Sequence, residues 1–353
     1  MEELFKQAMQ QAAALKKQPE SVPWENDEPW AQPFHRWSAE KDAWEPVKLP
    51  ASRNAEQTTS GGDGLTSLAL YTWNIDAIVP ASEARMDAAL AHLQELTGQL
   101  LSTPTTAVVI FLQECIPSDL KTIGQKQWIR DRFYLTDIDD STWASGAYGT
   151  TTLVDRRLDV SSCFRVHYSK TKMERDALFV DAAIPTPSSE LSKTLRLCNT
   201  HLESLAPVPP LRPSQMQLVA KYMHADGLSG AIVAGDFNGI QPEDESLHID
   251  NDLKDAYLEV GGQPGGKDEG FTWGQQAHPG LRERFGLSRM DKVFFCGESL
   301  RLLKFKRFGE DVVVDEAQKE QRNELLALGF EKAWVTDHLG LNAVFSFAND
   351  TTS

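Results

Sequence analysis

The feature that most constrains the fold is a series of short apolar runs, each of which ends abruptly in polar residues. Apolar residues follow one another without helical spacing at residues 68–73, 107–112, 195–198 and 231–234, which predicts four buried strands. Further strands are expected at residues 178–183, 292–295 and 339–347, and helices at residues 1–17, 83–101, 212–226 and 316–328. Strands and helices mixed without a strict βαβ rhythm indicate a mostly antiparallel, layered α/β domain.

The polar residues at the ends of these runs indicate a function. A single Gly-Asp-x-Asn or Asp-His group is explained equally well by a turn at a sheet edge. Five such groups in order are harder to explain as turns, because rigid strand ends that converge would hold a polar site precisely. The five groups are residues 72–76, 112–114, 199–204, 235–238 and 336–338.

The residue types in these groups suit hydrolysis of a phosphate ester. Glu114 and Asp337 offer the oxygen ligands that Mg²⁺ or Mn²⁺ prefers, and no Cys/His set for zinc is present in the sequence. Asp236 can hold or deprotonate a water, which Asn238 would orient. Such a set provides for in-line attack of a metal-aided water on a phosphodiester.

Two histidines complete this chemistry. His201 and His338 can donate hydrogen bonds to an oxyanion, and Asp291 could fix the tautomer and charge of one of them. A serine-hydrolase site is not expected, because Ser204 lacks a Gly-x-Ser-x-Gly elbow. The sequence contains neither Gly-x-x-x-x-Gly-Lys-Ser/Thr nor Gly-x-Gly-x-x-Gly, the two glycine motifs that bind nucleotide phosphates, so no nucleotide cofactor is expected.

The net charge limits how the chain could bind nucleic acid. At −16 over 353 residues, broad electrostatic attraction to a polyanion is excluded, so a local basic strip is required. Residues 281–307 contain eight basic and three acidic residues, a local charge of +5, although a solvated strand face would look the same. Arg175 and Arg212 are further candidates for phosphate contacts, or for structural ion pairs.

The N-terminal segment differs from the rest of the chain. Residues 19–64 lose the regular apolar pattern but hold four tryptophans, which predicts an arm packed on the main body rather than a free linker. No secretory signal and no membrane-spanning run is apparent, so an intracellular protein, nuclear or cytoplasmic, is expected. The four dispersed cysteines are accordingly interpreted as reduced thiols.

The order and wording of the motifs resemble a known superfamily. TWNID, LQE-x-IP, NTHLES, GDxN, FTW and TDHLGL, spread over residues 66–348, resemble the endonuclease/exonuclease/phosphatase superfamily, and within it the 5′-tyrosyl-DNA phosphodiesterases. The resemblance implies a four-layered sandwich, two packed mostly antiparallel sheets flanked by helices, over residues 66–353, with an arm over residues 1–65. It also implies Mg²⁺-dependent hydrolysis of 5′-phosphotyrosyl links on DNA ends.

The resemblance also implies a role for each matching residue. Glu114 becomes the principal metal ligand, with Asn74 in the metal and phosphate shell and Asp337 completing the metal side. Asp236 positions or activates the water, with Asn238 beside it. His338, supported by Asp291, stabilises the transition state. His201 and Ser204 contact the scissile phosphate, and Trp273 lines the groove for the DNA end.

Two departures from the pattern keep other substrates open. Animal members carry an arginine two residues after the Asn of GDxN, where this chain has Ile240, and an N-terminal ubiquitin-binding domain that the arm does not resemble. The alternatives on the same machinery are an abasic-site nuclease, an RNA 3′ exonuclease and a phospholipid or inositol-phosphate phosphatase. A non-catalytic binding module is the alternative outside enzymes, and the oligomeric state is not predicted.

Overall fold

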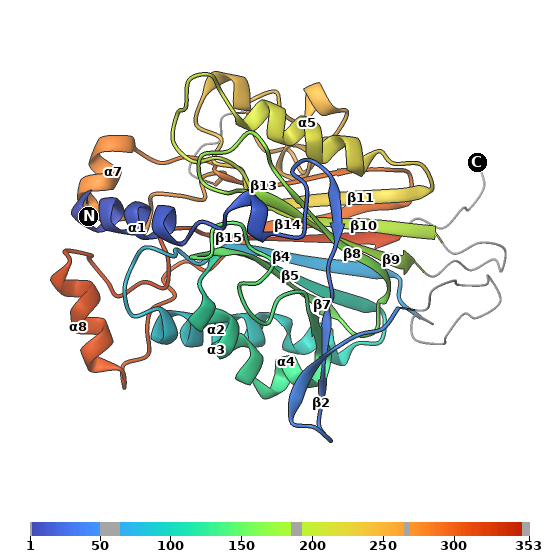
Figure 1. Ribbon diagram of the computed structural model, residues 1–353, viewed down its shortest axis with the longest axis horizontal. Coiled ribbons are helices and arrows are strands. Elements are labelled where there is room, and N and C mark those ends of the chain that lie inside the picture. The colour runs from blue at the N-terminus through green and yellow to red at the C-terminus, as the bar shows by residue number, and fades with distance from the viewer. Residues whose placement is uncertain (1, 50–63, 185–192, 265–268, 348–353) are drawn as a thin grey trace.

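The strands of the chain form two sheets that pack face to face. The computed structural model describes residues 2–49, 64–184, 193–264 and 269–347 (Figure 1). In this described part, one sheet has seven strands in the order β1 (Pro29–Ala31), β8 (Asp159–His167), β9 (Asp176–Ile184), β10 (Lys193–His201), β11 (Leu228–Asp236), β13 (Asp291–Cys296) and β12 (Lys254–Asp255). The other has eight, in the order β14 (Leu300–Phe308), β15 (Gly340–Phe347), β4 (Ser67–Asn74), β5 (Thr106–Cys115), β7 (Gly149–Asp155), β6 (Phe133–Leu135), β2 (His35–Ser38) and β3 (Ala43–Pro46).

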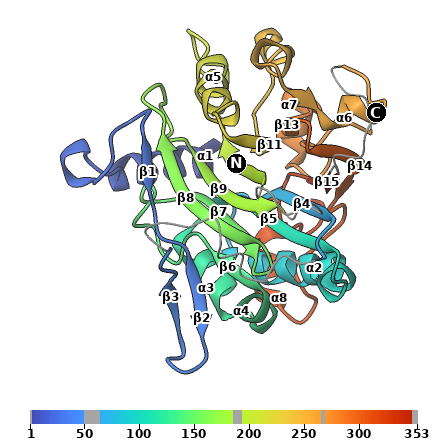
Figure 2. The ribbon, with the colours of Figure 1, turned by 90° about the vertical axis from the view of Figure 1, so that its right-hand side faces the viewer.

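Helices cover the outer faces of both sheets, which gives the four layers expected from the sequence (Figures 1 and 2). The eight-stranded sheet is covered by α2 (Ser82–Ser102), α3 (Pro117–Gln125) and α4 (Gln127–Arg132), and the seven-stranded sheet by α5 (Arg212–Met223). The other described helices are α1 (Glu2–Leu15), α6 (Ala256–Glu259), α7 (Pro279–Phe285) and α8 (Lys319–Ala327). No helix in these described ranges is long and apolar enough to cross a membrane.

Apolar side chains from both sheets interlock to form the central core. Leu70 and Phe111 of one sheet and Leu197 and Ile232 of the other are at most 1% exposed. Burial of each such side chain contributes about 1.5–3 kcal/mol to folding. Separate clusters fill the spaces under the helices on either side, so apolar contacts hold all four layers together.

Part of the predicted arm is built into the two sheets. β1 pairs antiparallel with β8 of the seven-stranded sheet, and β2 pairs with β6 of the eight-stranded sheet (Figure 2). The backbone of this segment therefore satisfies its hydrogen bonds within the sheets. Residues 50–63, next to the expected boundary at residue 65, lie outside the described part of the chain.

The topology brings polar strand ends from both sheets to one end of the sandwich. β4 runs parallel to β5, and β10 runs parallel to β11, whereas the other neighbouring strands in the described part of the chain are antiparallel. The carboxyl ends of both parallel pairs lie at the same end. Asn74 pairs with Gln113 there, and Asp236 stands between His201 and Asp291 in adjacent strands.

Candidate active site

The backbone at this end of the sandwich takes conformations that most residues avoid. Glu114 has a φ of 57°, at an irregularity in the pairing of β5 with β7, and Asn238 has a φ of 48°. Gly235 has a φ of 147°, and a Cβ there would lie 1.8 Å from the carbonyl oxygen of Thr200. Such positions cost free energy and cluster at functional sites, where they aim particular side chains. Glycine is required at position 235 so that Asp236 can follow it.

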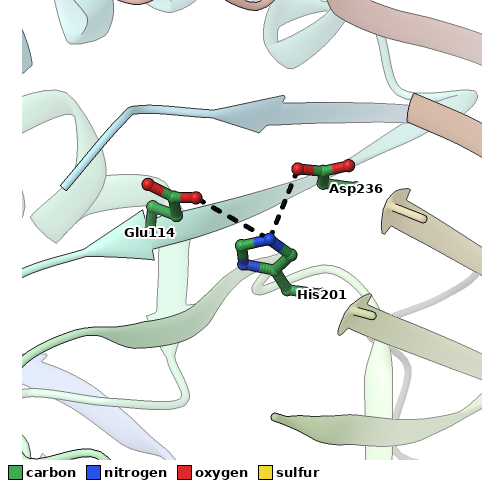
Figure 3. A group of neighbouring side chains, drawn as sticks. All are labelled: Glu114, His201 and Asp236. Carbon is green, nitrogen blue, oxygen red and sulfur yellow. Dashed lines mark ion pairs between the residues drawn. The ribbon is translucent and has the colours of Figure 1, made fainter. Parts of the chain in front are cut away.

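The side chains of Glu114, His201 and Asp236 form the centre of the site (Figure 3). The Nε2 atom of His201 lies 3.3 Å from Asp236 Oδ2 and 3.7 Å from Glu114 Oε1. Asn74 joins the two carboxylates, because its Nδ2 group donates to Glu114 at 3.2 Å and to Asp236 at 3.0 Å. His201 and Asp236 are buried, and the Glu114 side chain is 17% exposed, so the centre opens to solvent beside Glu114.

Arg175 determines which nitrogen of His201 carries the proton. Its Nη1 group lies 2.7 Å from His201 Nδ1, and its Nη2 group donates to Ser204 Oγ at 2.8 Å. Because a guanidinium can only donate, Nδ1 of His201 must accept, and the proton of the neutral ring resides on Nε2. His201 therefore points an N–H group into the centre of the site. The sequence-based assignment of Arg175 to a phosphate contact is corrected: it is 5% exposed and orients His201 and Ser204.

The proton distribution leaves Asp236 ionised. Burial alone would raise the pKa of Asp236, but His338, the N–H of His201 and the backbone N–H of Asn238 hold it well below 3.8. The Asn238 N–H donates to Asp236 Oδ1 at 2.8 Å, and its side chain donates to the carbonyl of Leu202 at 3.2 Å. An ionised carboxylate at this position can accept a hydrogen bond from a water.

His338 carries a proton because carboxylates surround it. Its Nδ1 atom lies 2.8 Å from Asp291 Oδ2, and its Nε2 atom lies 3.8 Å from Asp236 and 3.9 Å from Asp337. Burial favours the neutral ring, but Asp291 and Asp236 raise the pKa of His338 well above 6.5. Burial raises the pKa of Asp291 itself. The Nε2 atom of His338 is therefore a cationic donor that faces the ionised Asp236.

Glu114 and two further carboxylates, Asp76 and Asp337, repel one another. Burial and the neighbouring Asp337 and Glu114 raise the pKa of Asp76 to about 7. Burial and the neighbouring Glu114 also raise the pKa of Asp337. A divalent cation would relieve this repulsion, and carboxylate oxygens are the ligands that hard cations prefer. By comparison, the ligand atoms of Glu114, His201 and Asp236 lie within 4.8 Å of one another, but the protonated Nε2 of His201 cannot bind a metal.

Asp76 is therefore a site residue that the sequence alone did not single out. Its side chain accepts the backbone N–H groups of Ile78 and Val79, so the sequence resembles an ordinary Asp turn. Its position two residues beyond Asn74, at the end of a buried strand, was the available signal. Asn74 itself needs correction as a metal ligand, because its Oδ1 accepts the N–H of Asp76 and its NH₂ group faces the site.

The role of Trp273 changes, and for Arg212 the contacts favour the structural ion pair that the sequence left as an alternative to a phosphate contact. Trp273 is 8% exposed, and its indole N–H donates to Asp337 Oδ2 at 2.7 Å, so it orients a carboxylate rather than offering a face to a base. Arg212 is 1% exposed and forks onto the Asp244 carboxylate with distances of 2.7–2.9 Å. A buried paired guanidinium is a structural element, so Arg212 does not reach a phosphate.

The basic strip at residues 281–307 is broken up by the fold. Arg282 pairs with Glu331 at 2.9 Å, and Arg289 pairs with the buried Asp255 at 2.8 Å. Burial and Arg289 lower the pKa of Lys292 to about 7, and the residue is 6% exposed. The cations of the strip that remain exposed on β14 are Arg301, Lys304 and Lys306.

A two-sheet sandwich with carboxylates and imidazoles at the ends of its central strands defines a class of hydrolases that act on phosphate esters. The model of the Endonuclease/Exonuclease/phosphatase family matches residues 71–338, which include every central residue of the site. The chain belongs to this family. No curated protein matches it significantly by sequence.

Solved structures share the fold at low sequence identity. The truncated TDP2 of Caenorhabditis elegans superimposes with a TM-score of 0.59 at 22% identity, over 80% of this chain and 98% of that one. TDP2 of D. rerio, complexed with a single-strand DNA product, has a TM-score of 0.57 at 17% identity, with 79% and 98% covered. The catalytic domain of human Nocturnin has 0.52 at 16%, with 80% and 94% covered. At these identities the likeness shows the fold.

Proposed function

We propose that this protein is a Mg²⁺-dependent phosphodiesterase that hydrolyses 5′-phosphotyrosyl links at DNA ends. The observation that carries the proposal is the ionised Asp236 held between the N–H of His201 and the protonated His338, with three carboxylates beside it. The TDP2 structures support the choice of a DNA substrate, because one of them is complexed with a single-strand DNA product. The motifs NTHLES and TDHLGL support the tyrosyl adduct.

The metal would be held by Glu114, Asp76 and Asp337, with Mn²⁺ as a possible replacement for Mg²⁺. When bound, it would supply positive charge to a phosphate oxygen and to the departing phenolate oxygen. Trp273 would keep Asp337 turned toward this position through its indole N–H. Asn74 would hold Glu114 and Asp236 at their separation, since it donates to both.

The side chains on the opposite side would act on the water and the phosphate. Asp236 would accept a hydrogen bond from the attacking water and align it with the phosphorus, with Asn238 beside it. His338 and His201 would donate hydrogen bonds to the oxygens on which charge grows in the transition state. Asp291 and Arg175 would keep the two imidazoles in their donor forms, and Arg175 would also orient Ser204.

The division of the chain is part of this proposal. Residues 66–353 would form the catalytic domain, because all the residues assigned above lie within them. Residues 1–65 would be an arm that extends the two sheets through β1, β2 and β3.

A side-by-side assay tests the substrate. A 5′-tyrosyl oligonucleotide, an abasic duplex, a 3′-polyadenylated RNA and an inositol phosphate would be offered to the purified protein with Mg²⁺ and with EDTA. We expect Mg²⁺-dependent release of tyrosine, with lower specificity constants on the other three substrates. Faster turnover of any of those three would replace the substrate and keep the hydrolase. Equal activity of Asp236→Asn and wild type would show that the activity comes from a contaminant.

A further inference from the structure

A groove of about 580 Å³ lies where the hairpin of β2 and β3 meets α4. It is far from the candidate active site: Gly149, at the start of β7, pairs with Cys115 at the site end, and Asp155, at the end of β7, leads into the groove. The groove is lined by Arg36, Trp37, Ser38, Ala39, Glu40, Glu45, Pro46, Val47, Arg130, Asp131 and Arg156.

Three arginines from three different elements face this groove. Arg36 comes from β2, Arg130 from α4, and Arg156 from the turn after β7. In the part of the chain that the structure describes, none of the three has a carboxylate partner within ion-pair distance. Three guanidinium groups without a direct ion pair thus converge in a chain whose net charge is −16.

Two of the guanidinium groups are held in place by contacts that leave their charge unneutralised. Arg130 donates from Nε to the carbonyl of Gly124 at 2.8 Å, and its guanidinium lies 3.7 Å from the ring centre of Trp37. Arg156 donates from Nη1 to the carbonyl of Arg130 at 2.8 Å. Burial and the neighbouring Arg36 lower the pKa of Arg156, as expected where like charges approach one another.

We propose that this groove binds one phosphorylated side chain within an extended peptide of a partner protein. Guanidinium forks match the geometry of a phosphate, because each can donate two parallel hydrogen bonds to its oxygens. β3 is the last strand of its sheet in the described part of the chain, so its outer edge can pair with an extended segment.

The acidic residues of the groove select a single anion over a polyanion. Glu40, Glu45 and Asp131 also line it, and only Glu45 has a cationic partner, Lys41, in the described part of the chain. A nucleic acid backbone would bring several phosphates against these carboxylates, whereas a peptide with one phosphate can avoid them. The groove is thus a docking site independent of the proposed hydrolase function.

Fluorescence anisotropy tests the docking site. The probe is a fluorescein-labelled mixture of seven-residue peptides with a central phosphoserine and random flanks. R36Q/R156Q removes two of the cations, and K6Q/K221Q on α1 and α5 is the matched control with the same change in net charge. We expect R36Q/R156Q to weaken binding by about 10-fold or more, because each charge-assisted hydrogen bond contributes on that scale, and the control to bind like wild type.

Further measurements on the variants and on competing ligands make the outcome decisive. R36Q alone should weaken binding while the melting temperature stays unchanged, since the Arg36 side chain makes no hydrogen bond in the described part of the chain and its backbone pairing in β2 is kept. Turnover of p-nitrophenyl thymidine 5′-phosphate should be equal in all variants. The docking site is refuted if wild type does not bind, if R36Q/R156Q and the control lose the same affinity, if the unphosphorylated peptides bind equally well, or if a single-stranded oligonucleotide displaces the peptide.

Discussion

Glu114 stands in a left-handed backbone conformation between the donors and the carboxylates of the site. Its Oε2 accepts the backbone N–H of Ala77 at 2.9 Å, and its Oε1 accepts from Asn74. Burial favours the protonated acid, but His201, Arg175 and the Ala77 N–H lower the pKa of Glu114, so it stays ionised. Glu114 therefore brings a full negative charge to the position proposed for the metal.

Glu114→Gln should separate this charge from the shape of the side chain. We expect the rate of tyrosyl-oligonucleotide hydrolysis to fall by at least about 100-fold, because one ligand charge of the metal is lost. The melting temperature without metal should stay the same or fall, because the lowered pKa of Glu114 means that its negative charge stabilises the folded protein. Calorimetry and single-turnover kinetics over a range of Mg²⁺ concentrations measure both quantities. Wild-type rates at low Mg²⁺ would contradict the assignment.

Trp273 allows a second test of residue roles. Trp273→Phe keeps a buried aromatic ring but loses the N–H that orients Asp337. A hydrogen bond to a charged group contributes about 1.5–3 kcal/mol, so kcat should fall roughly 10-fold or more. The loss should be equal on a tyrosyl oligonucleotide and on p-nitrophenyl thymidine 5′-phosphate. A loss confined to the oligonucleotide would restore the groove role predicted from the sequence.

The sequence predicted the residue types of the site better than their contacts. The polar ends of the apolar runs pointed to Glu114, Asp236 and His338 because catalysis needs charged groups at rigid positions. The partners of Arg212, Trp273 and Arg175 lie 32, 64 and 26 residues away, and only the fold decides whether such a side chain pairs internally or faces a substrate. Burial of a cation is therefore the property that the sequence pattern could not supply.

At the scale of helices and strands, predictability followed the apolar content of each element. The central strands β4, β5, β10 and β11 were predicted because their buried runs satisfy a local pattern. β7 and β8 were not, since GTTTLVD and DVSSCFRVH contain polar residues that are stabilised by neighbouring strands. The three arm strands, β1, β2 and β3, were not predicted for the same reason. β1 pairs with β8 and β2 with β6, as in Trp30↔Arg165 and His35↔Leu135, so these partners lie about 100 to 135 residues further along the chain, and β3 pairs with β2.

His167 joins the arm to the seven-stranded sheet and makes this junction sensitive to acid. Its ring stacks on Trp24 with centres 3.9 Å apart, and its Nε2 lies 2.9 Å from the carbonyl of Thr142. Burial lowers the pKa of His167 to about 4, although Asp176 opposes the shift. The folded protein therefore binds this proton less readily than the unfolded chain, whose pKa is near 6.5.

This difference fixes the sign of a pH effect. The stabilising contribution of neutral His167 is complete above pH 6.5 and is lost as the pH falls toward 4, by roughly 3 kcal/mol in total. His167→Gln keeps a donor for Thr142 and cannot titrate, so its unfolding free energy should change less between pH 7 and pH 4. Urea denaturation of both proteins at several pH values measures the difference. Parallel pH profiles would show that His167 does not carry this dependence.

At the scale of the whole molecule, an acidic protein is proposed to act on an acidic polymer. The net charge of −16 repels DNA at long range. Within the basic strip, Arg282 and Arg289 pair with carboxylates of the protein and Lys292 is buried, so their charges are not available to DNA. Attraction must then come from the metal, from the imidazoles of the site and from the few cations left on β14. An enzyme of this kind should favour short single-stranded ends over long duplexes, because each added phosphate adds repulsion.

The salt dependence of catalysis tests this arrangement. With Arg301, Lys304 and Lys306 as the exposed cations of β14, a plot of log kcat/KM against log salt concentration should have a slope no steeper than about −2 on a single-stranded tyrosyl substrate. K304E/K306E changes the net charge from −16 to −20, since each reversal subtracts two, and should bring the slope to zero or make it positive. K6E/K221E carries the same charge change on α1 and α5 and should keep most of the wild-type slope. Turnover of p-nitrophenyl thymidine 5′-phosphate should be unaffected in both variants. If the two variants shift the slope equally, the effect is one of net charge alone and β14 makes no contact with the substrate.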